Sequence, residues 1–258
     1  MPKSFYIGLS WMSSGGGPSE RRKHSAEGRR ILALLDALPS ALPLEPKEAV
    51  LKRPITYEAG GRPYFEPSGQ PHADFSISHS RNMVAAALLS AAPEGVGGVL
   101  PGRIGCDIQC CNPGKSFVEI SRRFFQACEQ AYIEEDPAAQ LQRFYQVWVL
   151  KEAWLKMHGL SVFDMPKAPA FCIGGVQTGT VENASDTDFF LYELSSPVSG
   201  FEPTGGAMYT LAAACQRIHS GGESEPEIRW FSDLALALKR VENIYAAQSP
   251  VNTVTPKM

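Results

Sequence analysis

The order in which helical and strand-like patterns follow one another constrains the fold of this chain most strongly. Apolar residues recur at helical spacing near the N-terminus, over 117–158 and again near the C-terminus, and short apolar runs typical of strands separate these segments. Helices and strands therefore occur in groups and do not alternate one by one, which predicts an α+β protein. We expect two similar-sized α+β halves, residues 1–102 and 103–220, with a cleft between them, and then a C-terminal helix and a loose tail over 221–258.

Capping and turn residues predict where several elements begin and end. Ser25 is the expected N-cap of a first helix that Pro39 closes. The pair Arg81 and Asn82 separates two short apolar runs, 73–80 and 83–90, which indicates neighbouring strands. The other expected strands cover 61–65, 103–109, 170–175, 188–196 and 207–216, and the last expected helix covers 230–245.

Charge and cysteine content argue against several classes of protein. The 258-residue chain has a net charge of −3 and an isoelectric point near 6.0, which argues against general nucleic-acid binding. It has no run of 18 apolar residues, and its first residues lack the apolar stretch of a secretion signal, so a cytoplasmic protein outside the membrane is expected. Cys106, Cys110 and Cys111 lie close together, but no second cysteine pair completes a zinc site, and reduced thiols are expected.

Basic residues surround the start of the first expected helix. Five arginine and lysine residues lie within ten positions, in a protein whose net charge is negative. Such a cluster suits a phosphate-binding site, although a solvated, charged helix start has the same composition. The five residues are Arg21, Arg22, Lys23, Arg29 and Arg30.

The helix expected over 144–159 carries two charged residues on a face that is not fully polar. Glu152 and Lys156 project almost opposite the main apolar stripe of this helix, and Trp148 and Leu155 lie between the two faces. By itself the pattern also fits an exposed helix in which residues four positions apart form an ion pair. The apolar stripe consists of Val147, Leu150, Trp154 and Met157.

Three short motifs follow one another along the chain: "FSISHS" at 75–80, "IGCDIQ" at 104–109 and "WVLKEAWLKMHG" at 148–159. In this order and at this spacing they resemble the 4′-phosphopantetheinyl transferases of the Sfp type. That family has Ser-His, then Gly-x-Asp-x-Glu, then Trp-x-x-Lys-Glu-Ala-x-x-Lys. The resemblance extends over roughly residues 20–215, and the chain departs from the pattern at Gln109, where the family has a glutamate.

The resemblance implies both a fold and a reaction. The implied fold is pseudo-dimeric, with two α+β halves and the active site in the cleft between them. In the implied reaction, coenzyme A donates its 4′-phosphopantetheine arm to a serine of an apo acyl, peptidyl or aryl carrier protein, and adenosine 3′,5′-bisphosphate leaves. Mg²⁺ is the implied cofactor, and a chain that contains both halves is expected to be a monomer.

Site residues follow from the resemblance position by position. Asp107, Gln109 and Glu152 are expected to bind Mg²⁺, a hard cation that prefers oxygen ligands. Glu152 is the implied base for the serine proton, Lys156 is placed to neutralise the leaving phosphate, and Asp107 completes the catalytic set. Coenzyme A is expected to contact a further set in which either arginine of the pair 29–30 points inward. That set is Arg29, Arg30, Arg62, Ser78, His79, Lys151 and Lys156.

Alternatives remain open at the level of the sequence. His79 also fits a purely structural histidine on a strand, and Lys151 lies about 100° around the helix from Glu152. Gln109 raises the alternative of a catalytically degenerate homologue that binds coenzyme A or a carrier protein without transfer. A third alternative is an unrelated Mg²⁺-dependent nucleotide-binding enzyme, although no glycine-rich phosphate-binding fingerprint follows a strand.

Overall fold

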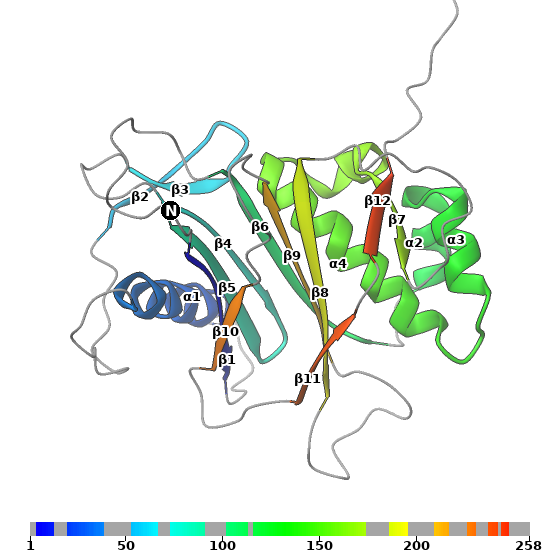
Figure 1. Cartoon of the computed structure of the whole chain (residues 1–258), viewed down its shortest axis with the longest axis horizontal. Helices are drawn as coiled ribbons and strands as arrows, with labels where there is room; N and C mark the ends of the chain where they lie inside the picture. The colour runs from blue at the N-terminus through cyan, green and yellow to red at the C-terminus, as the bar shows by residue number, and fades with distance from the viewer. Residues whose placement is uncertain are drawn as a thin grey trace, which may run out of the picture.

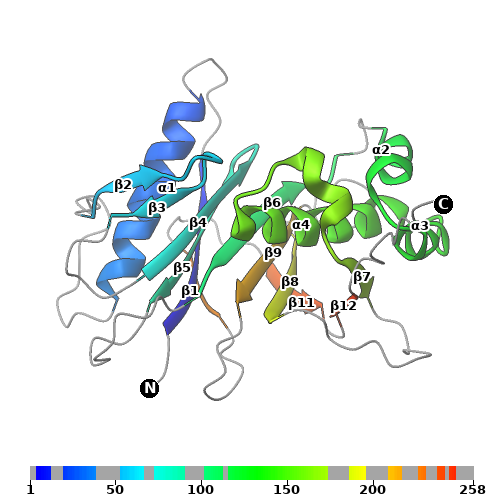
Figure 2. The same cartoon turned by 90° about the horizontal axis from the view of Figure 1, so that it is seen from above.

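Two four-stranded β-sheets lie face to face between helices in the computed structural model of this chain (Figures 1 and 2). The structure describes residues 4–12, 20–38, 53–66, 73–90, 102–112, 116–173, 186–195, 209–216, 226–230, 237–241 and 244–247. The predicted α+β class is confirmed. Among these residues no helix combines the length and the apolar character that a membrane crossing requires.

The first half contains one long helix and most of one sheet. Its elements are β1 (Ser4–Trp11), α1 (Glu20–Ala37), β2 (Ile55–Tyr57), β3 (Pro63–Phe65), β4 (Ala73–Ser80) and β5 (Met83–Ser90). The second half contains β6 (Ile104–Cys110), α2 (Phe117–Phe124), α3 (Ala127–Glu134), α4 (Gln140–His158), the 3₁₀ helix η1 (Val162–Lys167), β7 (Ala170–Ile173), β8 (Thr187–Ser195) and β9 (Tyr209–Gln216). Three short strands follow, β10 (Glu227–Trp230), β11 (Ala237–Val241) and β12 (Ile244–Ala247).

Both sheets place their strands in the same relation to chain order. The first sheet runs β10-β1-β5-β4 and the second runs β11-β8-β9-β6. In the first half, β1 lies beside β5, the last long strand, and α1 lies between β1 and β4 in the chain. In the second half, β6 lies beside β9, the last long strand, and the helical segment from α2 to η1 lies between β6 and β8 in the chain. Because β4 and β6 end their sheets, each presents a free edge where the two halves meet.

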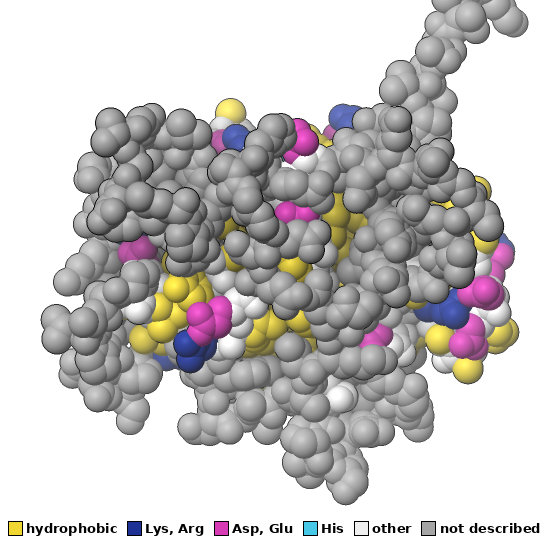
Figure 3. Space-filling model, in the orientation of Figure 1, with side chains coloured by type: hydrophobic (Ala, Val, Ile, Leu, Met, Phe, Trp, Pro, Cys, Tyr) yellow, Lys and Arg dark blue, Asp and Glu magenta, His cyan; other side chains and the backbone are white. Residues whose placement is uncertain are grey.

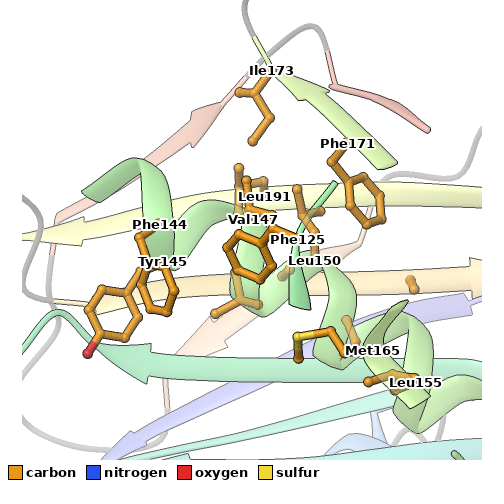
Figure 4. Packing of buried hydrophobic residues seen from close by; sticks show 14 of the residues in the cluster. Phe125, Phe144, Tyr145, Val147, Leu150, Leu155, Met165, Phe171, Ile173 and Leu191 are labelled. Carbon is orange, nitrogen blue, oxygen red and sulfur yellow. The ribbon is translucent and has the colours of Figure 1, made fainter. Parts of the chain in front are cut away.

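Three apolar cores hold these layers together. Side chains of α1, such as Leu32 and Leu35, pack on the outer face of the first sheet. The inner faces of the two sheets form a second core that includes Ile7 and Leu211. The third core lies between the second sheet and α4 (Figure 4), where one side of α4 contributes many of the labelled side chains. This packing fixes α4 against β6 and β9.

The C-terminal segment contradicts one prediction. The helix expected over 230–245 is wrong, because the described residues there form β10, β11 and β12. Pairing of β10 with β1 and of β11 with β8 satisfies backbone groups at two sheet edges, a tertiary gain that local spacing does not report.

The start of the first helix also differs from the prediction. Helix α1 begins at Glu20, so Ser25 lies inside the helix, exposed, and is not its N-cap. On the face of the molecule in Figure 3, acidic and basic side chains lie next to each other on both sides of the view.

Candidate active site

Helix α4 crosses strand β6 at a glycine, and this contact places the two charged motifs side by side. A Cβ atom on Gly105 would lie 2.0 Å from the carbonyl oxygen of Ala153 and 2.6 Å from the amide nitrogen of Met157. Only a residue without a side chain allows so close an approach of helix and strand backbones. The approach brings Asp107, two residues along β6, next to the face of α4 that carries the predicted Glu–Lys pair.

Asp107 stands at the centre of a buried polar cluster. One of its carboxylate oxygens accepts hydrogen bonds from the Ser78 hydroxyl at 2.7 Å and from the Lys156 ammonium at 2.6 Å. Lys156 also donates to the hydroxyl oxygen of Ser78 at 3.0 Å. Three elements, β4, β6 and α4, therefore meet in one network. Only 1% of Asp107 is exposed, whereas the Lys156 side chain is 30% exposed and reaches solvent.

The charge on Lys156 is retained in this setting. Burial by itself lowers the pKa of Lys156, but the Asp107 carboxylate, with smaller contributions from Cys106 and Glu152, raises that pKa above its ordinary value. A lysine ammonium held beside a carboxylate and open to solvent is suited to a second negative partner, such as a phosphate.

Glu152 is the carboxylate with the most altered acidity in the cluster. Burial and then the negative charge of Asp107 raise the pKa of Glu152 from 4.5 to about 7, and Lys156 offsets only part of this shift. No hydrogen bond to the Glu152 carboxylate is found among the described residues. A half-buried carboxylate whose pKa is near neutral can accept a proton at physiological pH, which is the property of a general base.

Gln109 lies on the same face of β6 as Asp107, as expected for residues two apart on a strand. Its amide nitrogen donates to the second carboxylate oxygen of Asp107 at 3.1 Å. Its carbonyl oxygen thus points away from Asp107, and the amide has to rotate before that oxygen can ligate a cation held by Asp107. Among the described residues no group of three His, Cys, Asp or Glu side chains that could hold a metal ion is found.

Arg62 is held mainly by protein groups. Its guanidinium forms a buried ion pair with Asp74 and donates to the backbone oxygens of Ile104 and Lys156, both at 3.1 Å. These contacts connect the turn between β2 and β3 to β4, β6 and the end of α4. Beside Arg62 lies an open pocket of ≈ 210 Å³. Its lining includes Lys156, Phe75, Ile77 and the glycines of that turn.

The end of α4 at this pocket is shaped by a left-handed glycine. Gly159 caps the helix with φ of 69°, a conformation that favours glycine. The turn of the β2–β3 hairpin packs closely on this cap, since a Cβ atom on Gly60 would lie 2.8 Å from the Gly159 oxygen. The pocket is therefore formed jointly by the two halves.

The predicted His79 lies on the side of β4 that faces α1, and α1 carries the predicted arginines Arg29 and Arg30. The exposed His79 ring stacks on His24 with ring centroids 4.6 Å apart and an angle of 19° between the planes. Sequence reasoning missed His24 as a partner, because its signal was only one residue in a basic cluster. Arg29 is exposed. The half-buried Arg30 donates a 2.8 Å hydrogen bond to the Glu27 carboxylate, and this bond has to break before Arg30 can turn inward.

Lys151 does not join the cluster. Its ammonium is fully buried on the other side of α4, 3.0 Å from the Glu129 carboxylate and 3.1 Å from the Pro169 carbonyl oxygen. The structure therefore does not bring Lys151 together with the other residues expected to contact coenzyme A. The rotation of about 100° that separates Lys151 from Glu152 places Lys151 in the core under α3 and β7.

Comparison with known proteins finds a similar family for the segment that carries most of this cluster. Residues 103–202 match the model of the 4′-phosphopantetheinyl transferase superfamily, and this segment contains both β6 and α4. The resemblance that the three motifs predicted is confirmed. Asp107, Gln109, Glu152 and Lys156 lie inside the superfamily segment, and Ser78 lies outside it.

Individual relatives that are 4′-phosphopantetheinyl transferases by name match stretches of 90 to 144 residues of the chain. The 4′-phosphopantetheinyl transferase AcpT of Salmonella typhi is 30% identical over 112 residues, 43% of this chain and 52% of the relative. A putative 4′-phosphopantetheinyl transferase of Synechocystis is 26% identical over 144 residues, 55% of this chain and 54% of the relative. The transferase Sfp of Bacillus subtilis is 33% identical over 90 residues, 34% of each chain. The chain spans about half the length of the first of these relatives.

Proposed function

We propose that this protein transfers the 4′-phosphopantetheine arm of coenzyme A to a serine of an apo carrier protein and releases adenosine 3′,5′-bisphosphate. The observation that carries the proposal is the cluster of Ser78, Asp107 and Lys156 beside Glu152, with β6 and α4 inside the superfamily segment. We further propose that the two halves form a pseudo-dimer with the active site between them, which the matching strand orders support. A monomeric, cytoplasmic enzyme is part of the same proposal.

The residues of the cluster divide the chemistry of transfer between them. The carrier serine oxygen forms a bond to the phosphorus nearer the pantetheine, and the bond from that phosphorus to the oxygen of the leaving nucleotide breaks. Glu152 takes the serine proton as general base. Lys156 neutralises negative charge that develops on the leaving phosphate. Asp107 holds the Lys156 ammonium in place through the 2.6 Å ion pair.

The donor set fits a magnesium ion. Asp107 and Glu152 offer carboxylate oxygens and Gln109 offers a carboxamide oxygen, all three preferred by hard cations. A bound cation would offset the negative charge of Asp107, which together with burial raises the pKa of Glu152. Bound there, Mg²⁺ would supply positive charge to the pyrophosphate. We assign Asp107, Glu152 and, after rotation of its amide, Gln109 as its protein ligands.

Coenzyme A would bind where basic side chains from both halves converge. Lys156 and Arg62 line the pocket beside the β2–β3 turn, and Ser78 lies in the adjoining cluster. His79, with Arg29 or Arg30 of α1 nearby in the first half, would receive phosphate groups of the donor. Since the guanidinium of Arg62 already has several protein partners, we expect it to contribute mostly long-range charge.

One assay tests the transfer directly. The protein is incubated with coenzyme A, Mg²⁺ and an apo acyl or peptidyl carrier protein, and the carrier is weighed by mass spectrometry. We expect the carrier to gain the mass of one phosphopantetheine arm, with loss of the gain when its acceptor serine is replaced by alanine. Fatty-acid, polyketide and non-ribosomal peptide carriers are tested side by side. Binding of coenzyme A without a mass gain on any carrier would instead support the degenerate-homologue alternative.

Gln109→Glu should lower the Mg²⁺ concentration required for half-maximal transfer. The change raises the charge of the proposed ligand set from −2 to −3, and a hard cation binds more strongly to the more negative set. In the absence of metal, the added charge beside Asp107 should lower the free energy of unfolding. We therefore expect Mg²⁺ to raise the melting temperature of Gln109→Glu more than that of the parent protein.

The control for this prediction is Gln130→Glu, a change of the same type on α3. Gln130 lies more than 20 positions along the chain from Gln109 and from Glu152, and its side-chain amide donates a hydrogen bond to the Phe125 carbonyl oxygen. Its Mg²⁺ response should match that of the parent. If Gln109→Glu leaves both the Mg²⁺ dependence and the melting shift unchanged, Gln109 is not a ligand.

A further inference from the structure

Four alternate side chains of β4 accept hydrogen bonds from four alternate backbone amides of β6. The Asp74 carboxylate accepts from the Ile104 amide at 2.8 Å, and the Ser76 hydroxyl accepts from the Cys106 amide at 3.0 Å. Two more serines continue the series toward the other end of β4. Ser78 accepts from Ile108 at 3.2 Å and Ser80 accepts from Cys110 at 2.9 Å. Each donor lies 30 positions after its acceptor, so the two strands run in parallel in one fixed register.

This series, which we call the β4–β6 ladder, satisfies a strand edge that would otherwise be unpaired. In strand β6 the amides of one set of alternate residues point toward β9, and those of the other set point toward the free edge of the sheet. A buried amide without a partner is strongly disfavoured. The side chains of β4 take the place of a neighbouring strand's carbonyl groups, and only the β4–β6 register seen here pairs all four amides at once.

The ladder also fixes where the active cluster is assembled. Its third acceptor, Ser78, is the residue of the first half that hydrogen-bonds Asp107 and Lys156 of the second half. Ser76 lies two residues earlier and only 6% of it is exposed. No hydrogen bond of the Ser76 hydroxyl to Asp107, Glu152 or Lys156 is found among the described residues.

We propose that Ser76 is a positioning residue, which holds β4 and β6 in register so that Ser78 meets Asp107 and Lys156. A shift of the strands by a fraction of an ångström would separate the first half's donor-binding side chains from the second half's charged cluster. The catalytic consequence rests on the proposed transferase activity, whereas the register itself does not. The two can therefore be tested separately.

The kinetic test uses Ser76→Ala, which removes the acceptor for the Cys106 amide and leaves the charged cluster intact. We expect kcat to fall about tenfold or more, since small displacements far from the reacting atoms lower rates by such factors. The KM values for coenzyme A and carrier protein should change less than about threefold. Ser76→Thr retains the hydroxyl and should restore most of kcat. A rise in the KM for coenzyme A at unchanged kcat would overturn the proposal, because Ser76 also lines the pocket and would then act by direct contact.

The matched control is Ser121→Ala. Ser121 is equally buried, 5% exposed, but its hydroxyl donates within α2 to the Val118 oxygen and not between the halves. This variant should keep kcat within about twofold of the parent. Equal losses of kcat in Ser76→Ala and Ser121→Ala would show a general loss of stability and would overturn the positioning role.

The structural test follows amide hydrogen exchange of the intact protein without substrates. In Ser76→Ala we expect faster exchange at the Cys106 amide and also at Ile108, the next donor of the ladder, whereas Ser121→Ala leaves both unchanged. Unchanged protection of Ile108 would overturn the proposal. If the parent transfers to no carrier but Ile108 loses protection, the proposed function fails and the register role is supported. If Ser76→Ala does not fold, Ser80→Ala at the half-buried end of the ladder provides the same readout at Cys110 and Ile108.

Discussion

Glu152→Gln should lower the rate of phosphopantetheine transfer by two to four orders of magnitude. Glutamine keeps the shape of the side chain but cannot accept the serine proton, and general bases contribute about 10²- to 10⁴-fold to a rate. It also removes one of the two carboxylates assigned to the metal. Transfer is measured by mass spectrometry of the carrier at saturating coenzyme A and Mg²⁺. Glu134→Gln, an exposed change of the same type on α3, should retain the parent rate.

The same replacement should stabilise the metal-free protein at neutral and alkaline pH. The pKa of Glu152 is raised from 4.5 to about 7, so the folded state favours the protonated carboxyl more than the unfolded state does. The resulting loss of stability in the parent begins as pH rises through 4.5 and is complete above about pH 7. Since one pKa unit corresponds to about 1.4 kcal/mol, Glu152→Gln should be more stable by up to about 3 kcal/mol above that pH.

Denaturant unfolding in the presence of a chelator measures the difference in free energy of unfolding between Glu152→Gln and the parent protein. It is carried out at several pH values between roughly 5 and 8.5, on both sides of the pH at which Glu152 titrates in the folded protein. The gain in free energy of unfolding should shrink steadily as pH falls toward the ordinary pKa of a glutamate. A gain that is the same at all pH values would mean that the Glu152 carboxylate is not strained by burial and by Asp107. Loss of activity together with a gain in stability is the expected mark of a residue retained for function.

Local pattern was sufficient for the parts of the fold in which burial follows sequence spacing. The alternating strands β4 and β6 and the helix α4 were predicted from apolar period and from the turn at Arg81 and Asn82. The strands β10 and β11 were not, because they exist through pairing with the edges of β1 and β8. The information for that pairing is distributed over residues more than 200 positions apart for β1 and β10, well beyond any local window.

The candidate site shows the same division. Asp107, Ser78 and Lys156, each taken from a different motif, lie together in the structure. Lys151 was drawn into the site by its place beside Glu152 in the motif, although helical geometry turns it toward the core. The polar alternation of Asp74, Ser76, Ser78 and Ser80 was visible as a strand face, but its partner could not be identified until β6 was placed against it.

The last prediction concerns the ion pair that binds Lys151 into that core. Glu129 and Lys151 both have fully buried side chains, and the Glu129 carboxylate also accepts from the Phe171 and Gln126 amides at 2.9 and 2.8 Å. Burial lowers the pKa of Lys151 and raises that of Glu129, and the attraction between the two charges opposes both shifts. The pair therefore connects α3, α4 and the start of β7 only as long as both charges are present.

Lys151→Met should lower the free energy of unfolding by about 3–5 kcal/mol at pH 8, because it leaves a buried carboxylate without its counter-charge. The loss should be smaller at pH 5, since Glu129 in this variant can take up a proton and its pKa is already raised by burial. The double variant Lys151→Met with Glu129→Gln should recover part of the stability and lose the pH dependence. As a control, Lys167→Met removes a pair with Asp164 whose lysine is 69% exposed, and it should change stability by at most about 1 kcal/mol. Chemical denaturation of the parent, the two single variants and the double variant at both pH values measures these differences in free energy of unfolding. If Lys151→Met is as stable as the exposed control Lys167→Met, the buried pair does not hold α3 and β7 on α4.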